Sequence, residues 1–227
     1  MCDARLWGGP TGPICQAVSN AGWTFSFPKL GFARSISDMA ARALASHDGP
    51  LVPIGFSMGG IIALEMAKMA MERLVGLVLI DTTARADLRG SERLRQQEAV
   101  RAGHLERVVR EELKPNYLAA CNGDNQDLLA LLRAMALDLG PDVFIAQSEA
   151  LRTRADLSPV LPHLSIPVLL ACGEEDRLCP PALHQALADE IPKTKSIVFP
   201  KAGHLLPLEQ PHLLASALSS YFASLQE

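Results

Sequence analysis

Five short apolar segments divide the chain, and each is followed by a turn or by polar residues. Two of them, at 74–80 and 168–173, contain no polar residue, which is typical of strands buried on both faces of a parallel sheet. Together these segments predict five strands. They are Thr24–Phe27, Leu51–Ile54, Leu74–Ile80, Val168–Gly173 and Ser196–Phe199.

Between these runs, apolar residues recur at helical spacing. A helix is predicted from Ser35 to Ala45, with Ser35 or Ser37 as its N-cap, and a second helix is predicted from Ile61 to Glu72. The order strand, helix, strand, helix is that of a parallel βαβ unit. The pattern therefore predicts an α/β protein with a mostly parallel sheet.

The turn that joins the strand Leu51–Ile54 to the following helix has the sequence Gly55-Phe56-Ser57-Met58-Gly59-Gly60. A Gly-x-Ser-x-Gly turn in this position holds the serine hydroxyl at the tip of a sharp bend, because small residues two before and two after it let the two backbones pass closely. We therefore expect Ser57 to be an exposed nucleophile. The first N–H groups of the helix would face the atom that Ser57 attacks, so the amide of Met58 is predicted to donate to a developing oxyanion.

Taken alone, this motif also fits a glycine-rich turn capped by a serine. Two later stretches favour a catalytic role for Ser57 over a purely structural turn. Asp176 follows the strand at 168–173, and His204 follows the strand at 196–199, so the chain order is serine, acid, histidine. This is the order of a nucleophile, its orienting acid and its general base on a parallel sheet.

Three stretches together, GFSMGG, GEEDRLCP and AGHLLPLEQP, resemble the α/β-hydrolase fold superfamily, and specifically its small esterase-like members. The resemblance runs over nearly the whole chain. It implies a mostly parallel sheet of the α/β-hydrolase type with helices on both faces, and a triad of Ser57, Asp176 and His204. Some hydrolases place the acid after an earlier strand, which leaves Asp81 as the alternative to Asp176.

The resemblance also implies strands that precede the first one predicted here. In the superfamily one of them lies between the strands near Phe25 and Val52, and ends in a loop that supplies a second oxyanion amide. The segment Cys2–Trp7 looks like what usually follows that loop. We therefore expect either that the sheet closes this gap or that Met1 is not the natural start. Amides of Gly8–Pro13 could replace the second donor, although a surface turn is the simpler interpretation of that stretch.

Residues 84–157 are predicted to form a helical insertion between two strands. Its first half mixes arginines with glutamates, as a solvated helix face does, and its second half is rich in leucine up to a break at Gly140-Pro141. Since it follows the strand beside the nucleophile, we expect a lid that covers an apolar acyl or alkyl pocket. No linker-like stretch divides the chain, so residues 1–227 are expected to form a single domain.

Composition excludes several classes of partner. A net charge of −4 and a pI near 5.9 argue against binding to nucleic acid or to an anionic membrane. No apolar run reaches the roughly 18 to 20 residues that span a bilayer, and the start of the sequence lacks the features of a secretory signal. The five cysteines have no paired spacing, which predicts reduced thiols in a cytoplasmic protein.

No metal or cofactor is expected, because the histidines and acids lack metal-ligand spacing and no phosphate loop or dinucleotide fingerprint occurs. The predicted function is hydrolysis of a small carboxylic ester with an apolar part, through an acyl intermediate on Ser57. The same triad would also serve thioester, lactone or carbon–carbon bond hydrolysis, or cofactor-free perhydrolysis. A non-catalytic hydrolase-like binding protein is the alternative from another class, since the second oxyanion donor is not evident.

Overall fold

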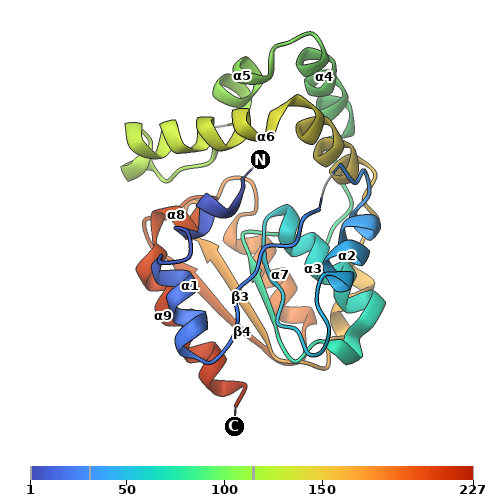
Figure 1. The fold of residues 1–227 in the computed structure, drawn as a ribbon, viewed down its shortest axis with the longest axis vertical. Coiled ribbons are helices and arrows are strands. Elements are labelled where there is room, and N and C mark those ends of the chain that lie inside the picture. The colour runs from blue at the N-terminus through green and yellow to red at the C-terminus, as the bar shows by residue number, and fades with distance from the viewer. Residues whose placement is uncertain (1, 31, 114–115, 227) are drawn as a thin grey trace.

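A parallel four-stranded sheet, in the order β1-β2-β3-β4, forms the centre of the computed structural model, which describes residues 2–30, 32–113 and 116–226 (Figure 1). The register pairs Phe56 with Ile80, Ile80 with Ala171, and Gly173 with Phe199, so the carboxyl ends of all four strands meet at one edge. The strands are β1 (Ile54–Phe56), β2 (Leu77–Ile80), β3 (Val168–Gly173) and β4 (Thr194–Phe199).

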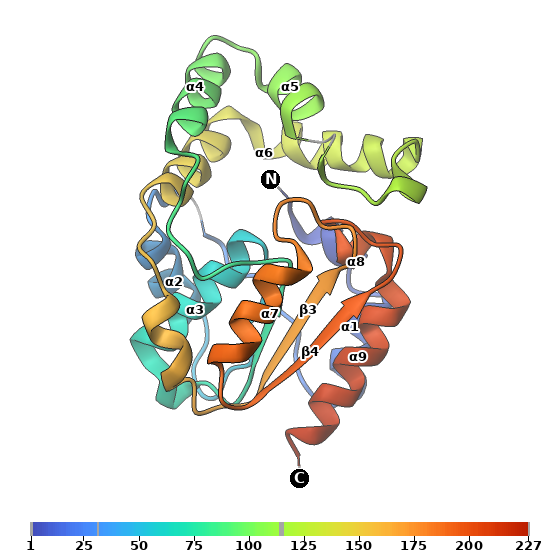
Figure 2. The same ribbon diagram turned by 180° about the vertical axis from the view of Figure 1, so that it is seen from behind.

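Helices cover both faces of this sheet, as predicted. Because successive strand side chains point to opposite faces, Leu77 and Leu79 pack into the core with α2 and α3, whereas Val78 and Ile80 pack into the core with α1 and α9. Figure 2 displays the two layers from behind. The helices are α1 (Pro13–Asn20), α2 (Ile36–Ala45), α3 (Met58–Ala70), α7 (Pro181–Glu190), α8 (Leu206–Glu209) and α9 (Pro211–Ser224), with short 3-10 turns at Ala4–Trp7 (η1), Met71–Arg73 (η2) and Ser158–His163 (η6).

Two predicted elements are found with small shifts. The helix predicted from Ser35 is α2, and the Ser35 side chain caps it by accepting a hydrogen bond from the Asp38 amide. Its buried face carries Met39 and Ala40, both fully enclosed. The strand predicted at 51–54 lies later in the sequence, at Ile54–Phe56 (β1). Before it, Leu51 forms only an isolated bridge with Leu74.

The predicted strand Thr24–Phe27 is wrong. Residues 23–30 form neither a helix nor a strand, and the sheet of the described chain ends at β1. This segment is held by its side chains: the Phe25 ring lies 5.8 Å from that of Trp7, and the Trp23 ring lies 5.7 Å from that of Phe222. The gap expected beside β1 is therefore present and the sheet does not close it.

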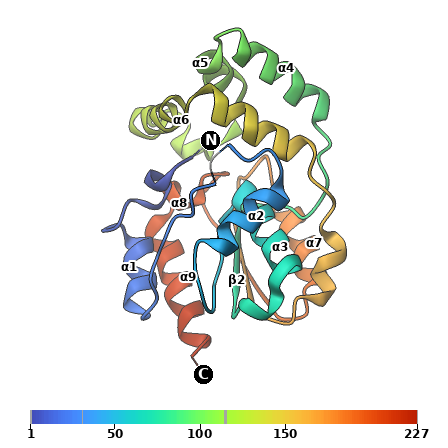
Figure 3. The ribbon, with the colours of Figure 1, turned by 45° about the vertical axis from the view of Figure 1, so that its right-hand side comes forward.

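The elements of the described residues between 84 and 157 are all helical, as the pattern predicts, and they form a separate layer above the carboxyl ends of the strands (Figure 3). The long helix α6 bends at Gly140, which has a φ of 80°, at the break expected from Gly140-Pro141. No helix within the described residues is long and apolar enough to span a bilayer. The elements of this layer are α4 (Gly90–Arg101), α5 (Leu105–Arg107), a π-helical turn η3 (Val108–Leu113), η5 (Ala120–Asn122) and α6 (Gln126–Arg152).

Candidate active site

Ser57 lies between β1 and α3 in a strained backbone conformation, with φ 51° and ψ −115°. Its N–H donates to the carbonyl of Ile80 at 2.8 Å, which ties the bend to β2. Non-glycine residues rarely adopt positive φ, and such strain persists only where the surrounding structure enforces it. The predicted sharp bend at Ser57 is present, although the residue is half-buried and not exposed as expected.

Close packing at the bend depends on Gly55 and Gly60. A Cβ atom on Gly55 would lie 2.4 Å from the carbonyl oxygen of Gly59, and one on Gly60 would lie 2.6 Å from the Thr82 side chain. A Cβ atom on Gly59 would meet no atom within 4 Å. The sequence prediction placed the second close approach at Gly59, two residues after the serine, and that assignment is wrong.

The structure brings Ser57, His204 and Asp176 together. The distance from Ser57 Oγ to His204 Nε2 is 3.0 Å, and the distance from His204 Nδ1 to Asp176 Oδ2 is 2.8 Å. An ionised carboxylate only accepts hydrogen bonds, so Nδ1 carries the proton and Nε2 is free to accept from the serine hydroxyl. This tautomer is the one in which the imidazole can act as a base toward Ser57.

Asp176 is held in its charged form despite its burial. Burial would raise the pKa of this carboxyl, but hydrogen bonds from His204 and from the amides of Cys179 and Leu178 bring its pKa below the ordinary value. The two amides bind Oδ1 at 2.9 and 2.7 Å and leave Oδ2 for the imidazole. The turn after β3 thus supplies a fixed negative charge behind the histidine.

Asp81, the alternative acid, does not reach His204. Its carboxylate accepts from the Gly173 amide at 2.9 Å and from the Leu206 amide at 3.3 Å, so it joins the end of β3 to the start of α8. Burial, and then the charge of Asp176, raise the pKa of Asp81 well above its ordinary value. Asp81 therefore links the two loops that carry Asp176 and His204.

Two residues that the sequence analysis did not single out hold the histidine loop. The His204 amide donates to the Tyr117 carbonyl at 2.8 Å, and the Tyr117 ring lies 5.8 Å from the imidazole. The Glu209 carboxylate accepts from the amides of Gly203 and Ala119, both at 2.8 Å. Glu209 stands in the stretch AGHLLPLEQP, so its position was a usable signal, whereas nothing in the pattern around Tyr117 indicated its role.

Met58 is the first residue of α3, where backbone N–H groups have no partner within the helix. Its amide immediately follows the nucleophile, which is the position of an oxyanion donor. The turn at Gly8–Gly12, considered as a source of a second donor, is not among the residues that line the cavity at Ser57. It leads into α1 instead.

A metal would fit this site poorly. Ligand atoms of Asp176, Cys179 and His204 lie within 4.8 Å of one another. However, both oxygens of Asp176 are engaged by hydrogen bonds, His204 Nδ1 carries a proton toward it, and burial raises the pKa of the Cys179 thiol. A thiol and a protonated nitrogen are not metal ligands, so the donor set suits proton transfer.

A cavity of about 1190 Å³ opens at Ser57 and His204. Leu139 and Val143 of α6 give it the apolar roof expected from the sequence, but Arg89, Arg93 and Gln96 also face it. Glu112 lines the same cavity, so the underside of the helical layer carries charged groups of both signs, which the expectation of an apolar pocket missed. Arg93 pairs with the buried Asp87, whose carboxylate also binds Arg154.

Comparison with known proteins identifies the family of this chain. A model described as "Alpha/beta hydrolase family" matches residues 3–217. A solved thermophilic esterase from Thermogutta terrifontis superposes with a TM-score of 0.81 at 29% identity, covering 89% of this chain and 76% of that one. Pimeloyl-[acyl-carrier protein] methyl ester esterase of Klebsiella pneumoniae is 31% identical over 76% of this chain and 69% of its own. A putative non-heme bromoperoxidase, BpoC, of Mycobacterium tuberculosis is 26% identical over 93% of this chain and 84% of its own.

Proposed function

Since this chain belongs to the α/β hydrolase family, we propose that it hydrolyses small carboxylic esters through a covalent acyl intermediate on Ser57. The observation that carries this proposal is the hydrogen-bonded series from Ser57 through His204 to Asp176 at the wall of an open cavity. The relatives described as esterases support an ester as the bond that is hydrolysed.

In the first half-reaction, Ser57 Oγ attacks the ester carbonyl carbon while its proton moves to His204 Nε2. Asp176 stabilises the imidazolium, and the Met58 amide donates to the carbonyl oxygen as it becomes an oxyanion. The alcohol then leaves with the proton from His204, and the acyl group stays on Ser57. In the second half-reaction, His204 takes a proton from water as the water oxygen attacks the acyl carbon. The bond to Ser57 Oγ then breaks, His204 returns the proton to this oxygen, and the acid is released.

The cavity wall favours an ester with an apolar part. Three apolar residues that are close in sequence to the proposed triad line the cavity, namely Phe56, Met58 and Leu178. The helical layer contributes Arg89 and Arg93 to the same lining. We propose that residues 84–157 act as a lid of a single domain comprising residues 1–227. Closure of such a lid excludes water and strengthens the electrostatic interactions beneath it.

Steady-state hydrolysis of p-nitrophenyl acetate and butyrate tests the proposal. Ser57→Ala should lower kcat by a factor on the order of 10⁶ if the triad acts as a unit. Ser219→Ala, an exposed serine of α9, is the matched control and should keep the parent rate. Turnover that survives in Ser57→Ala would remove this residue from the mechanism.

The alternatives use the same residues and are separated by substrate. An acyl thioester, a lactone, a substrate with an activated carbon–carbon bond, and peroxide with acetate should each be compared with the esters in the parent and in Ser57→Ala. The non-catalytic alternative predicts no turnover of any of them, together with ligand affinity that Ser57→Ala leaves unchanged. A second oxyanion donor is typically worth roughly 10² to 10³ in rate, which is why its absence from the sequence pattern supports that alternative.

A further inference from the structure

The start of α4 turns polar side chains toward the cavity. Arg89, Arg93 and Gln96 follow one another at spacings of four and three residues, so they share one face of the helix, and all three line the cavity. A helix that covers a core normally places apolar residues on its inner face. The apolar part of this roof comes from α6 instead, through Leu139 and Val143.

Most of the charged groups beneath the helical layer are already paired. Arg89 donates to both carboxylate oxygens of Glu92, at 2.7 and 2.6 Å. Glu112 is bound by two arginines that are not part of the cavity lining. The Gln96 side-chain amide donates to Glu92 and to Glu112. None of these groups therefore offers an uncompensated charge to a ligand.

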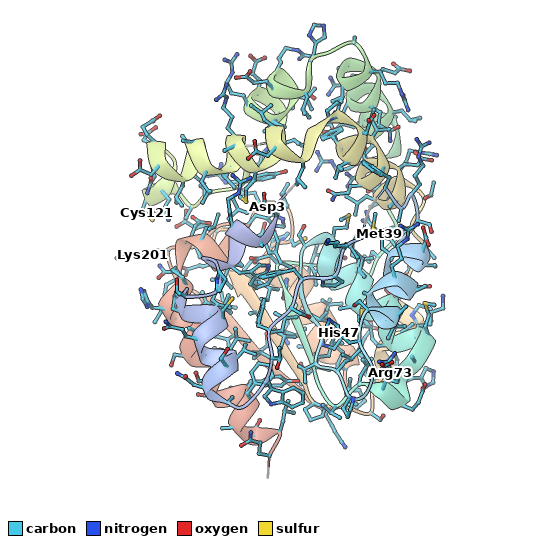
Figure 4. All side chains as sticks on the ribbon, in the orientation of Figure 1. Asp3, Met39, His47, Arg73, Cys121 and Lys201 are labelled. Atoms are coloured by element: carbon cyan, nitrogen blue, oxygen red, sulfur yellow. The ribbon has the colours of Figure 1, made fainter. Side chains whose placement is uncertain are left out.

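The remaining charged residues of the lining, apart from Arg93, are paired or lie away from α4. Asp3 is bound by the guanidinium of Arg5 through both of its oxygens. Lys29 and Asp48 are exposed. Figure 4 shows His47, the neighbour of Asp48 in sequence, beside the sheet and far below the helical layer, whereas Asp3 lies just under that layer.

Arg93 is the exception, because its charge is only partly compensated. Its Nε donates to both oxygens of Asp87 at 3.1 Å, and the same carboxylate accepts from Arg154 at 3.0 Å. Two guanidinium groups thus share one carboxylate, which leaves one positive charge in excess. Three backbone carbonyls occupy the other donors of Arg154. No described residue accepts a hydrogen bond from Nη1 or Nη2 of Arg93, whose side chain is 19% exposed.

The guanidinium of Arg93 lies near the proposed reacting groups. Burial raises the pKa of the Tyr117 hydroxyl, and the positive charges of Arg89 and Arg93 act against this rise. The Tyr117 ring in turn lies 5.8 Å from the imidazole of His204. Since Ser57, His204 and Arg93 line one cavity, a molecule whose carbonyl group lies at Ser57 can extend to Arg93 without leaving it.

The two free donors of Arg93 have the geometry of a carboxylate site. Nη1 and Nη2 form a planar fork, which matches the two oxygens of a carboxylate. One carboxylate also balances the single excess charge, whereas a phosphate monoester, with a charge of about −1.5 to −2 at pH 7, would leave negative charge in the cavity. The apolar side chains of Leu139 and Val143 in the same roof favour an apolar chain in the rest of the ligand.

We propose that Arg93 binds a free carboxylate of the substrate, so that the preferred esters carry an apolar chain between the ester group and a terminal carboxylate. This inference rests on the ester hydrolysis proposed above and names its substrate class. Arg93 acts as a specificity-determining residue, because it contacts the end of the substrate that does not react. The fixed pairing of its Nε with Asp87 holds the fork in place before the substrate binds.

Paired substrates that differ in one charge test this proposal. Monomethyl adipate is compared with methyl adipamate, in which a neutral amide replaces the carboxylate, and γ-acetoxybutyrate with γ-acetoxybutyramide. The parent should show kcat/KM about 10- to 100-fold higher for the acid than for the amide in at least one pair, since a charged partner strengthens each hydrogen bond. The pair that shows the preference identifies the acyl or the alcohol side as the one that reaches Arg93. No preference in either pair would overturn the proposal.

Variants of α4 assign the preference to one side chain. Arg93→Gln should abolish it, and Arg93→Lys, which keeps a cation beside Asp87 but lacks the fork, should retain only part of it. The rate of each variant on the neutral amide reports whether its fold is intact. Arg101→Gln is the matched control, because Arg101 is exposed on the same helix and is not part of the lining, so this variant should keep the full preference. A preference that survives in Arg93→Gln, or that is lost in Arg101→Gln, would overturn the assignment.

Binding to Ser57→Ala separates this inference from the proposed function. Titration calorimetry should show tighter binding of the acid than of the amide to Ser57→Ala, by about 10- to 100-fold in the preferred pair. Adding Arg93→Gln to this variant should remove the difference. If the parent hydrolyses none of these esters, the proposed function fails while the calorimetry still tests Arg93. Equal affinities for acid and amide in both pairs would overturn the carboxylate site itself.

Discussion

The hydroxyl of Thr82 donates a hydrogen bond of 2.7 Å to the backbone carbonyl of Ser57. In a trans peptide this carbonyl and the N–H of Met58 belong to one plane and point in opposite directions. Thr82, which directly follows the buried Asp81, therefore sets the direction of the Met58 amide, the donor proposed for the developing oxyanion. The Thr82 amide is in turn held by His184 Nε2 at 3.0 Å, so α7 supports the nucleophile turn through two hydrogen bonds.

Replacing this hydroxyl should reduce kcat without changing KM. Thr82→Val keeps the shape of the side chain but frees the peptide between Ser57 and Met58, and we expect kcat for p-nitrophenyl butyrate to fall about tenfold. This is less than the roughly 10² to 10³ lost when an oxyanion donor itself is removed. Thr82→Ser keeps the hydroxyl and should restore most of the rate. Equal losses in both variants would mean that Thr82 acts through packing against Gly60 alone.

The two glycines of the nucleophile turn should respond in opposite ways to a methyl group. Gly55→Ala places a Cβ atom 2.4 Å from the Gly59 carbonyl, so β1 and α3 must separate and both stability and turnover should be lost. Gly59→Ala meets no atom within 4 Å and lies in a helix, where alanine is favoured over glycine by up to about 1 kcal/mol. Thermal unfolding should therefore show Gly59→Ala at or above the parent Tm. A destabilised Gly59→Ala beside a stable Gly55→Ala would contradict this packing.

The contrast between these glycines indicates what the sequence could and could not predict. Periodicity and motif spacing were enough for the parallel sheet, for α2 with its Ser35 cap, and for the proximity of Ser57, Asp176 and His204, because each depends on local pattern and chain order. Which glycine is crowded depends on how the turn packs: the backbone of Gly59 crowds Gly55, and Thr82, which follows β2, crowds Gly60. The edge pairing of Thr24–Phe27 failed for a similar reason: a strand forms only where a neighbour offers its backbone, and none of the described residues does so there.

Acid should destabilise the fold through His184. This side chain is 1% exposed and burial lowers its pKa to about 4. Its Nε2 accepts from Thr82, which leaves the buried Nδ1 of the described structure without a hydrogen-bond partner. The unfolded chain, with a histidine pKa near 6.5, binds a proton between about pH 6.5 and 4 that the folded chain does not. Stability therefore falls as pH is lowered through this window, by about 3 kcal/mol in total.

Urea unfolding at a series of pH values measures this effect. His184→Gln keeps an acceptor for the Thr82 amide but does not titrate, so its stability should vary less between pH 6.5 and 4 than that of the parent. His163→Gln, at an exposed histidine, is the control and should follow the parent curve. The prediction fails if the free energy of unfolding changes equally with pH in His184→Gln and in the parent.

The two buried carboxyls near the site should differ by orders of magnitude in their effect on turnover. Asp176→Asn leaves His204 Nδ1 facing an amide, which no longer fixes the productive tautomer, so kcat should fall by a factor of about 10⁴. Asp81 accepts from the amides of Gly173 and Leu206 and not from His204, so Asp81→Asn loses one of these two hydrogen bonds and leaves the partner of the imidazole in place. We expect Asp81→Asn to lower the Tm while kcat changes less than tenfold. The reverse ranking in kcat would make Asp81 the acid that serves His204, in the role that the chain order also allowed.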